Sequence, residues 1–155
     1  MPTETPSSAR KDALALLARR AYGVNQLKTR LAQKGHAPEM VDDAAEWLLS
    51  LGYLDDEAYA RDLVKDYAAK GYGLYRIRGE LLARLLDAEI VDQVLEELPP
   101  AGETLDRLIE RLSAGRDLDD PKQRRRLTDT LGRKGFAWEE IREALERAHA
   151  GLDGE

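Results

Sequence analysis

The residues of this chain recur at a fixed step of 50 positions, and this repeat constrains the fold more than any other feature. Four sets of equivalent residues stand at that step: Leu27, Ile77 and Leu127; Leu31, Leu81 and Leu131; Lys34, Arg84 and Lys134; and Val41, Val91 and Ile141. The apolar sets follow helical spacing, which indicates one supersecondary unit used three times, each copy burying the same face. A unit of about 50 residues is small for independent stability, so neighbouring copies are expected to support one another.

Composition excludes several kinds of site and location. The chain has no cysteine among its 155 residues, which excludes disulfides and thiolate metal sites. Its two histidines, His36 and His149, lie far apart without ligand spacing, so a zinc site is not expected. No apolar run approaches the roughly 18 residues of a membrane span. The first residues lack the apolar core of a signal peptide, so a cytoplasmic protein is predicted.

The charge of the chain is negative and unevenly spread. The net charge is −6, made up of +1 over residues 1–52, −5 over 53–98 and −2 over 99–155. Bulk charge therefore does not favour the neutralisation of many phosphates. Any contact with nucleic acid must come from a local basic face.

Apolar stripes at helical spacing, interrupted by glycine and proline, predict about nine helices and no strand. Gly35 is expected to end a helix, because glycine tolerates the positive φ common after a helix C-terminus. Asp120 and Pro121 form a strong helix start, a capping residue followed by proline. Leu85 is placed on the apolar stripe of the second unit's middle helix, and Trp138 on that of the last helix.

These signals predict an all-α fold of three tandem three-helix, helix-turn-helix-like repeats in an elongated, curved array. The predicted organisation is a disordered tail over residues 1–8, repeats over 9–52, 53–98 and 99–149, and a C-terminal tail over 150–155. Pro99 and Pro100 would act as a stiff linker between the second and third repeats.

The sequence shows no constellation typical of an enzyme or of a cofactor site. It contains neither a phosphate-binding glycine-rich loop nor a nucleophile elbow, and no serine stands near a histidine. Carboxylate pairs such as Asp55-Asp56 and Asp119-Asp120 stand at helix starts or on polar helix faces. There the capping of backbone N–H groups explains both their position and their type.

Basic residues on the middle helices are the main candidates for function. The candidate partner-binding residues are Lys28, Lys34, Tyr75, Arg76, Arg78, Arg84, Arg124, Arg125, Arg126, Arg133 and Lys134. A cation in a last helical turn also complements the helix dipole, which is an equally good explanation of Lys34, Arg84 and Lys134. Arg76 and Arg78 stand near a helix start, where the dipole disfavours them, so they indicate an anionic partner.

Two further candidates have open interpretations. Tyr75 should lie outside its helix's apolar stripe, so it either stacks on a base, contacts a protein or fills a core edge. Arg124, Arg125 and Arg126 form the densest basic cluster of the chain. That cluster either serves a partner or forms a solvated or internally paired face.

Several segments together carry a resemblance to a known family. They are Gly52-Tyr53-Leu54-Asp55-Asp56 followed by Tyr59-Ala60; Gly71-Tyr72-Gly73 with Arg76-Ile77-Arg78 and Glu80-Leu81; Leu17-Ala18-Arg19-Arg20 with Leu27, Leu31 and Lys34-Gly35; and Asp120-Pro121-Lys122 with Arg133-Lys134-Gly135-Phe136 and Ile141. Because these residues stand in three tandem helix-turn-helix-like units, the chain resembles the RecX family of recombination regulators over about residues 10–149. Leu85 and Leu86 depart from the Gly and aromatic residue found at the matching points of the other repeats.

The resemblance implies a bacterial protein that binds the RecA recombinase. Family members lodge in the groove of the RecA filament on single-stranded DNA and block its growth. They reduce ATP hydrolysis, strand exchange and coprotease activity, in recombination, DNA repair and the SOS response, and they bind DNA weakly and without sequence preference. The resemblance brings no catalytic residue, and we expect a monomer. The alternatives are a helix-turn-helix transcriptional regulator that binds DNA in a major groove, and a helical adaptor for another protein.

Overall fold

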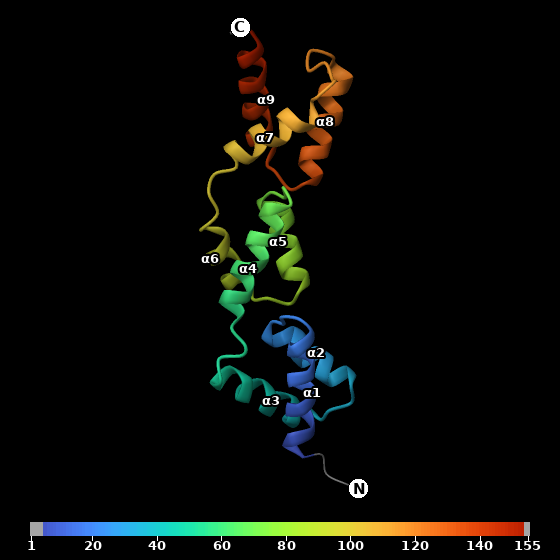
Figure 1. Cartoon of the computed structure of the whole chain (residues 1–155), viewed down its shortest axis with the longest axis vertical. Helices are drawn as coiled ribbons and strands as arrows, with labels where there is room; N and C mark the ends of the chain where they lie inside the picture. Colours follow the sequence, from blue (N-terminus) through green and yellow to red (C-terminus); the bar gives the residue numbers. More distant parts are fainter. Residues whose placement is uncertain (1–4, 154–155) are drawn as a thin grey trace. The chain divides into compact units, whose positions relative to one another are not determined.

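The structure is a computed structural model that describes residues 5–153, and every regular element in that range is an α-helix (Figure 1). The helices are α1 (Pro6–Arg19), α2 (Val24–Gln33), α3 (Pro38–Ser50), α4 (Asp56–Ala69), α5 (Leu74–Ala83), α6 (Ala88–Leu95), α7 (Gly102–Leu112), α8 (Pro121–Arg133) and α9 (Trp138–Asp153). They form three successive three-helix repeats, so the prediction of an all-α fold with three repeats is confirmed. None of the helices in the described range is long and apolar enough for a membrane span.

The chain divides into two compact units that do not coincide with the repeats. The first unit contains the chain up to Leu63 together with Leu81–Val94, and the second contains Val64–Glu80 together with the chain from Leu95 onward. Helices α4 and α5 therefore each pass from one unit to the other part-way along their length. The middle repeat contributes residues to both units, while the predicted boundaries between repeats stay predictions.

The first unit has its core where α1, α2 and α3 meet. Each of these helices packs against the other two. The core consists of buried Ala9, Ala13, Leu16, Tyr22, Leu27, Leu31, Val41, Ala44, Leu48 and Leu54. Leu27 and Leu31 stand one turn apart on α2, so they place one continuous apolar face against the neighbouring helices. Alanines supply much of the α1 and α3 surface in this core, and small side chains allow the backbones to approach closely.

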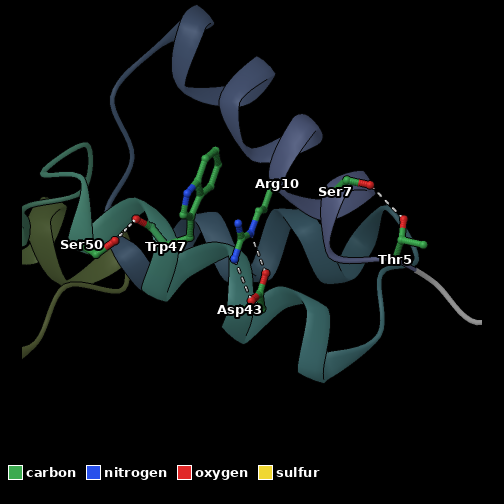
Figure 2. A network of polar contacts seen from close by, with 6 residues as sticks. All are labelled: Thr5, Ser7, Arg10, Asp43, Trp47 and Ser50. Carbon is green, nitrogen blue, oxygen red and sulfur yellow. Dashed lines mark hydrogen bonds and ion pairs between the residues drawn. The ribbon is translucent and has the colours of Figure 1, made fainter.

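A polar network joins α1 to α3 on the surface of this core (Figure 2). Arg10 donates two hydrogen bonds to the carboxylate of Asp43, Nε to Oδ2 at 2.9 Å and Nη2 to Oδ1 at 3.1 Å. Its guanidinium also lies 4.8 Å from the ring centroid of Trp47. Hydrogen bonding to Asp43 raises the pKa of Arg10, and the same bonds lower the pKa of Asp43.

The second unit has a core of its own around α7, α8 and α9. Its buried members are Leu105, Leu108, Ile109, Leu118, Leu127, Leu131, Phe136, Ile141, Ala144 and Leu145. Leu118 comes from the loop between α7 and α8, so one side chain of this loop is part of the core. Asp120 caps α8, accepting a hydrogen bond from the N–H of Lys122 at 3.0 Å, as the sequence predicted.

The three middle helices end in the same way at the same step of the repeat. Gly35, Leu85 and Gly135 all have positive φ, at 94°, 64° and 102°. After α2 the N–H of Gly35 donates to Ala32 at 3.0 Å, and the N–H of His36 to Leu31 at 3.3 Å, a pairing that closes the helix end. The placement of Leu85 on the apolar stripe is wrong, because α5 ends at Ala83 and Leu85 is 48 % exposed.

Part of each predicted tail is helical in the structure. Residues 6–8 form the first turn of α1, because Pro6 suits a helix start whose N–H would be unpaired anyway. Helix α9 continues to Asp153, so residues 150–153 are helical too. The tail prediction is wrong for these residues, while residues 1–4 and 154–155 lie outside the described part of the chain.

Candidate partner-binding site

Within the second unit, the start of α5 is fixed against the turn that follows α8. The N–H of Gly73 donates to the carbonyl of Lys134 at 2.7 Å, and the N–H of Tyr75 donates to that of Gly135 at 3.0 Å. Two N–H groups that a helix start leaves unpaired thus meet two carbonyls of a helix end. A Cβ atom at Gly73 would lie 2.6 Å from the carbonyl carbon and oxygen of Gly135, so the contact requires glycine. This contact therefore fixes the backbone at the start of α5.

A cluster of tyrosines and cations surrounds this contact. The guanidinium of Arg76 lies 4.3 Å from the ring centroid of Tyr72, and the ammonium of Lys134 lies 5.7 Å from the same centroid. Tyr72 stacks on Tyr67 with centroids 5.8 Å apart, and Lys70 lies 5.4 Å from the Tyr67 centroid. The aromatic faces attract the cations and allow them to gather without a carboxylate beside each one. The structure thus brings together Arg76 and Lys134, which the sequence singled out separately.

One carboxylate borders the cluster without neutralising it. Arg76 Nε lies 3.7 Å from Glu80 Oε1, and the hydroxyl of Tyr67 donates to Glu80 Oε2 at 3.3 Å. An exposed pair at this separation contributes little, about 0–1 kcal/mol, because water screens it. Arg76 therefore remains available to a partner.

Large side chains protrude next to the fixed contact. Tyr75 is 63 % exposed, which confirms that it lies outside the apolar stripe. Trp138, predicted to lie on the stripe of the last helix, is 62 % exposed at the first position of α9, so that placement is wrong. Trp138 lines a shallow hollow of about 500 Å³ together with Arg133. We call Tyr75, Arg76, Arg133, Lys134 and Trp138 the junction surface. Tryptophan, tyrosine and arginine are the residues most enriched among those that dominate protein–protein binding.

The arginine cluster of α8 belongs to the same unit. Arg125 and Arg126 are exposed and Arg124 is half-buried. Among the residues that the structure describes, no carboxylate forms an ion pair with any of the three. The interpretation of an internally paired face is therefore not supported. A solvated face and a partner-binding face both fit this geometry.

The other predicted residues have different surroundings. Lys28 pairs with Asp42 at 3.3 Å, and Lys34 is exposed at the C-terminal end of α2. Arg78 and Arg84 are half-buried and already take part in interactions within the chain. Lys28, Lys34 and Arg84 belong to the first compact unit, so the junction surface, which lies in the second, does not include them.

Sequence reasoning missed Tyr72 as the centre of the cluster, although the repeat carried a signal for it. The pairs Tyr22-Gly23 and Tyr72-Gly73 stand at the 50-residue step. In both, a guanidinium lies over the tyrosine ring, at 4.2 Å for Arg20 over Tyr22. In both, the glycine is buried against another segment. A tyrosine followed by a buried glycine thus marks the start of a middle helix that a neighbouring segment contacts.

A second omission concerns cations away from the aligned positions. Lys70, Arg107 and Arg111 line one hollow of about 380 Å³ in the second unit. Their positions fall outside the aligned sets, so the repeat could not reveal them. Among the described residues, no group of three or more His, Asp or Glu side chains is placed to hold a metal ion.

Comparisons with known proteins agree with this three-repeat organisation. Family models of the first, second and third three-helix domains of RecX match residues 9–48, 55–95 and 103–145. The chain belongs to the RecX family. A protein of Trichlorobacter lovleyi named Regulatory protein RecX is 38 % identical over 148 residues, which cover 92 % of this chain and 96 % of that protein. Proteins of the same name from Chromohalobacter salexigens and Pseudomonas entomophila are 35 % and 34 % identical, over 93 % and 89 % of this chain.

Solved structures of RecX proteins share the fold. The crystal structure of RecX from Lactobacillus salivarius superposes with a TM-score of 0.82, covering 92 % of this chain and 95 % of that one. A second crystal structure, of a regulatory protein RecX, gives a TM-score of 0.77 over 91 % of this chain and 71 % of that one. Both are 18 % identical to this chain, so they show a common architecture.

Proposed function

We propose that this chain is a negative regulator of the RecA recombinase that binds the RecA filament on single-stranded DNA. By occupying the filament it would limit filament extension, and with it ATP hydrolysis, strand exchange and coprotease activity in recombination, DNA repair and the SOS response. It would act in the cytoplasm as a monomer and by binding alone, without chemistry of its own. Its membership of the RecX family of regulatory proteins supports a regulatory role.

The junction surface is the observation that carries the binding proposal. Tyr75 and Trp138 are large exposed side chains, and Arg76 and Lys134 add positive charge around Tyr72 in the same unit. The backbone hydrogen bonds between α5 and the turn after α8 fix the backbone that carries Tyr75 and Lys134 before any partner arrives. Binding then costs less ordering entropy, which favours a high affinity for a given contact area.

The basic cluster of α8 supports a secondary contact with phosphate. Arg125 and Arg126 are exposed near the start of a well-capped helix. With a net charge of −6, the chain as a whole repels DNA, so the direct affinity for single-stranded DNA should be weak and without sequence preference. Lys28, Lys34, Arg78, Arg84 and Arg124 would at most add to this contact.

The same α8 cluster is the one observation that favours the alternative, a helix-turn-helix transcriptional regulator. Such a regulator would bind one DNA sequence tightly, in the range of about 10⁻⁸–10⁻¹¹ M, with a steep dependence on salt. Fluorescence anisotropy with random and genomic DNA at two salt concentrations separates the two functions. Weak, sequence-independent binding combined with tight binding to RecA filaments excludes the regulator.

The direct test is RecA ATP hydrolysis on single-stranded DNA in the presence of this protein. We expect inhibition at amounts below one molecule per RecA subunit. The double variant Tyr75→Ala, Trp138→Ala should need about tenfold more protein for half-inhibition, because both residues are of the kind that dominates interfaces. Tyr53→Ala is the matched control, since Tyr53 is 62 % exposed but belongs to the first unit.

The outcomes of this assay test the proposed function and the role of the junction surface separately. Absence of inhibition by the unmodified protein at equimolar amounts would refute the proposed function. Equal inhibition by the unmodified protein and the double variant would leave the function intact and remove the junction surface from the interface. Circular dichroism of each variant establishes that its helices are intact.

A further inference from the structure

The turns that follow the three middle helices are equivalent, and two of them hold the start of another helix. At the turn after α8, the carbonyls of Lys134 and Gly135 accept N–H groups from the start of α5. At the turn after α5, the carbonyl of Leu85 accepts a hydrogen bond from Asn25 Nδ2, near the start of α2, at 3.3 Å. Leu86 also lies against this helix start, since a Cβ at Gly23 would be 3.3 Å from its Cδ2. In each case, the helix end of one repeat receives the middle helix of the preceding repeat.

No described segment occupies the third such turn, which follows α2. No described residue donates a hydrogen bond to the carbonyl of Lys34 or of Gly35. Both residues are exposed, and a Cβ at Gly35 would meet nothing within 4 Å. At Gly135, by contrast, a Cβ would lie 2.5 Å from the Cβ of Arg76, because a helix occupies that turn. Gly35 therefore has a left-handed backbone conformation like that of Gly135, but no helix start from the described part of the chain lies against it.

We infer that the turn at Lys34 and Gly35 is a docking site for the N-terminus of an α-helix in a partner protein. The inference rests on the proposed function, in which that helix belongs to the RecA filament. The two carbonyls offer acceptors, and a helix start supplies unpaired N–H donors. By analogy with Gly73 before α5, the docking helix should carry glycine, or another very small residue, at the position before its first turn.

The middle helices of a second copy do not supply such a helix start. The start of α5 is already occupied, and the N–H of Val24 at the start of α2 is bound by Asp56 Oδ1 at 2.8 Å. The start of α8 differs in register, because Gln123 stands at the position equivalent to Gly73 and is already inside the helix. A side chain there would prevent the close backbone contact seen at Gly135.

The experiment compares two glycines of the same repeat that differ only in location. Gly35 and Gly52 both follow a helix with positive φ, at 94° and 77°, and both face open space. Asparagine tolerates positive φ, so Gly35→Asn and Gly52→Asn should fold alike. Each variant is titrated into the RecA ATP hydrolysis assay on single-stranded DNA. We expect Gly35→Asn to need about tenfold more protein for half-inhibition, the effect of losing two backbone hydrogen bonds, and Gly52→Asn to match the unmodified protein.

Each result has one meaning. Inhibition by the unmodified protein and by both variants at equal amounts overturns the docking site and leaves the proposed function standing. Equal weakening of both variants also overturns it, since strain at positive φ would then explain the loss. Sedimentation that shows a dimer dissociated by Gly35→Asn would assign the turn to a second copy instead. If deleting residues 1–4 strengthened inhibition and Gly35→Asn had no effect, the chain's own first residues would be the occupant. Lack of inhibition by the unmodified protein defeats both proposals.

Discussion

Leu85 occupies a backbone conformation that leucine rarely adopts. Its φ is 64°, where the equivalent positions in the other repeats carry Gly35 and Gly135. A side chain in this left-handed region costs about 1–2 kcal/mol, because Cβ approaches the following carbonyl oxygen. The turn keeps its shape because the helix end requires it, with the N–H of Leu85 bonded to Leu82 at 3.0 Å. The sequence alone showed that leucine replaces glycine at this position. It could not show whether the turn would change its shape or the leucine would adopt a positive φ.

We predict that Leu85→Gly stabilises the protein by about 0.5–1 kcal/mol, the relief of strain less the greater entropy of glycine in the unfolded chain. Urea unfolding measures the change. Leu85→Ala is the control, since it removes the exposed side chain and keeps the strained φ. Equal midpoints for the glycine and alanine variants would show that the left-handed conformation stores no strain.

The Arg10–Asp43 pair makes part of the stability depend on pH. Hydrogen bonding to Arg10 lowers the pKa of Asp43 in the folded protein, so the folded state binds a proton less readily than the unfolded state. The contribution is therefore complete at neutral pH and decreases as the pH falls below about 4, the ordinary range of an aspartate. We predict that Asp43→Asn lowers the melting temperature at pH 7 and that the difference narrows in acid. A difference that stays constant from pH 7 to pH 2 would contradict the role of this carboxylate.

At the scale of helices, glycine determines how one repeat meets the next. Gly73 and Gly79 both belong to the α5 region, yet a Cβ at Gly73 would collide with Gly135, and a Cβ at Gly79 would meet nothing within 4 Å. The first glycine permits an approach between backbones. The second only weakens an exposed helix, because glycine gives the unfolded chain more freedom.

Substitution by alanine should therefore have opposite effects at the two positions. Gly73→Ala should destabilise by about 1–3 kcal/mol, as overpacking does, while Gly79→Ala should stabilise by up to about 1 kcal/mol through helix propensity. Urea unfolding of both variants tests the pair. An equal gain in stability at both positions would mean that the contact between α5 and the turn after α8 contributes nothing beyond helix propensity.

The existence and ends of the helices were largely predictable, because local chemistry decides them. Asp120 and Pro121 start α8 as predicted, and Gly35 ends α2 as predicted. Trp138 shows the limit, since its spacing fits the last apolar stripe, yet it stands at the first position of α9 and is exposed. Periodicity cannot tell which member of a stripe lies beyond the edge of the core. The close contact of Gly73 with Gly135 was equally out of reach, because it joins residues of different repeats.

At the scale of the whole molecule, the sequence repeat and the packing follow different boundaries. The repeat suggests three like blocks, whereas the middle block contributes to both compact units. For the candidate site, the sequence identified Lys134 through its aligned position and Arg76 through its place near a helix start. Their common contact with Tyr72 depends on tertiary structure, which alignment of the repeats does not contain.

The start of α8, which differs in register from the start of α5, also determines how an array of such repeats could be lengthened. An added fourth block after α9 would have to place its own turn on α8. There Pro121 has no N–H, the N–H of Lys122 is bound to Asp120, and Gln123 fills the place of a glycine. A repeat added at the C-terminal side would therefore have no free helix start for its turn to bind. A repeat inserted ahead of α1 could instead place its middle helix on the carbonyls of Lys34 and Gly35. A designer extending this scaffold should therefore add repeats at its N-terminal side.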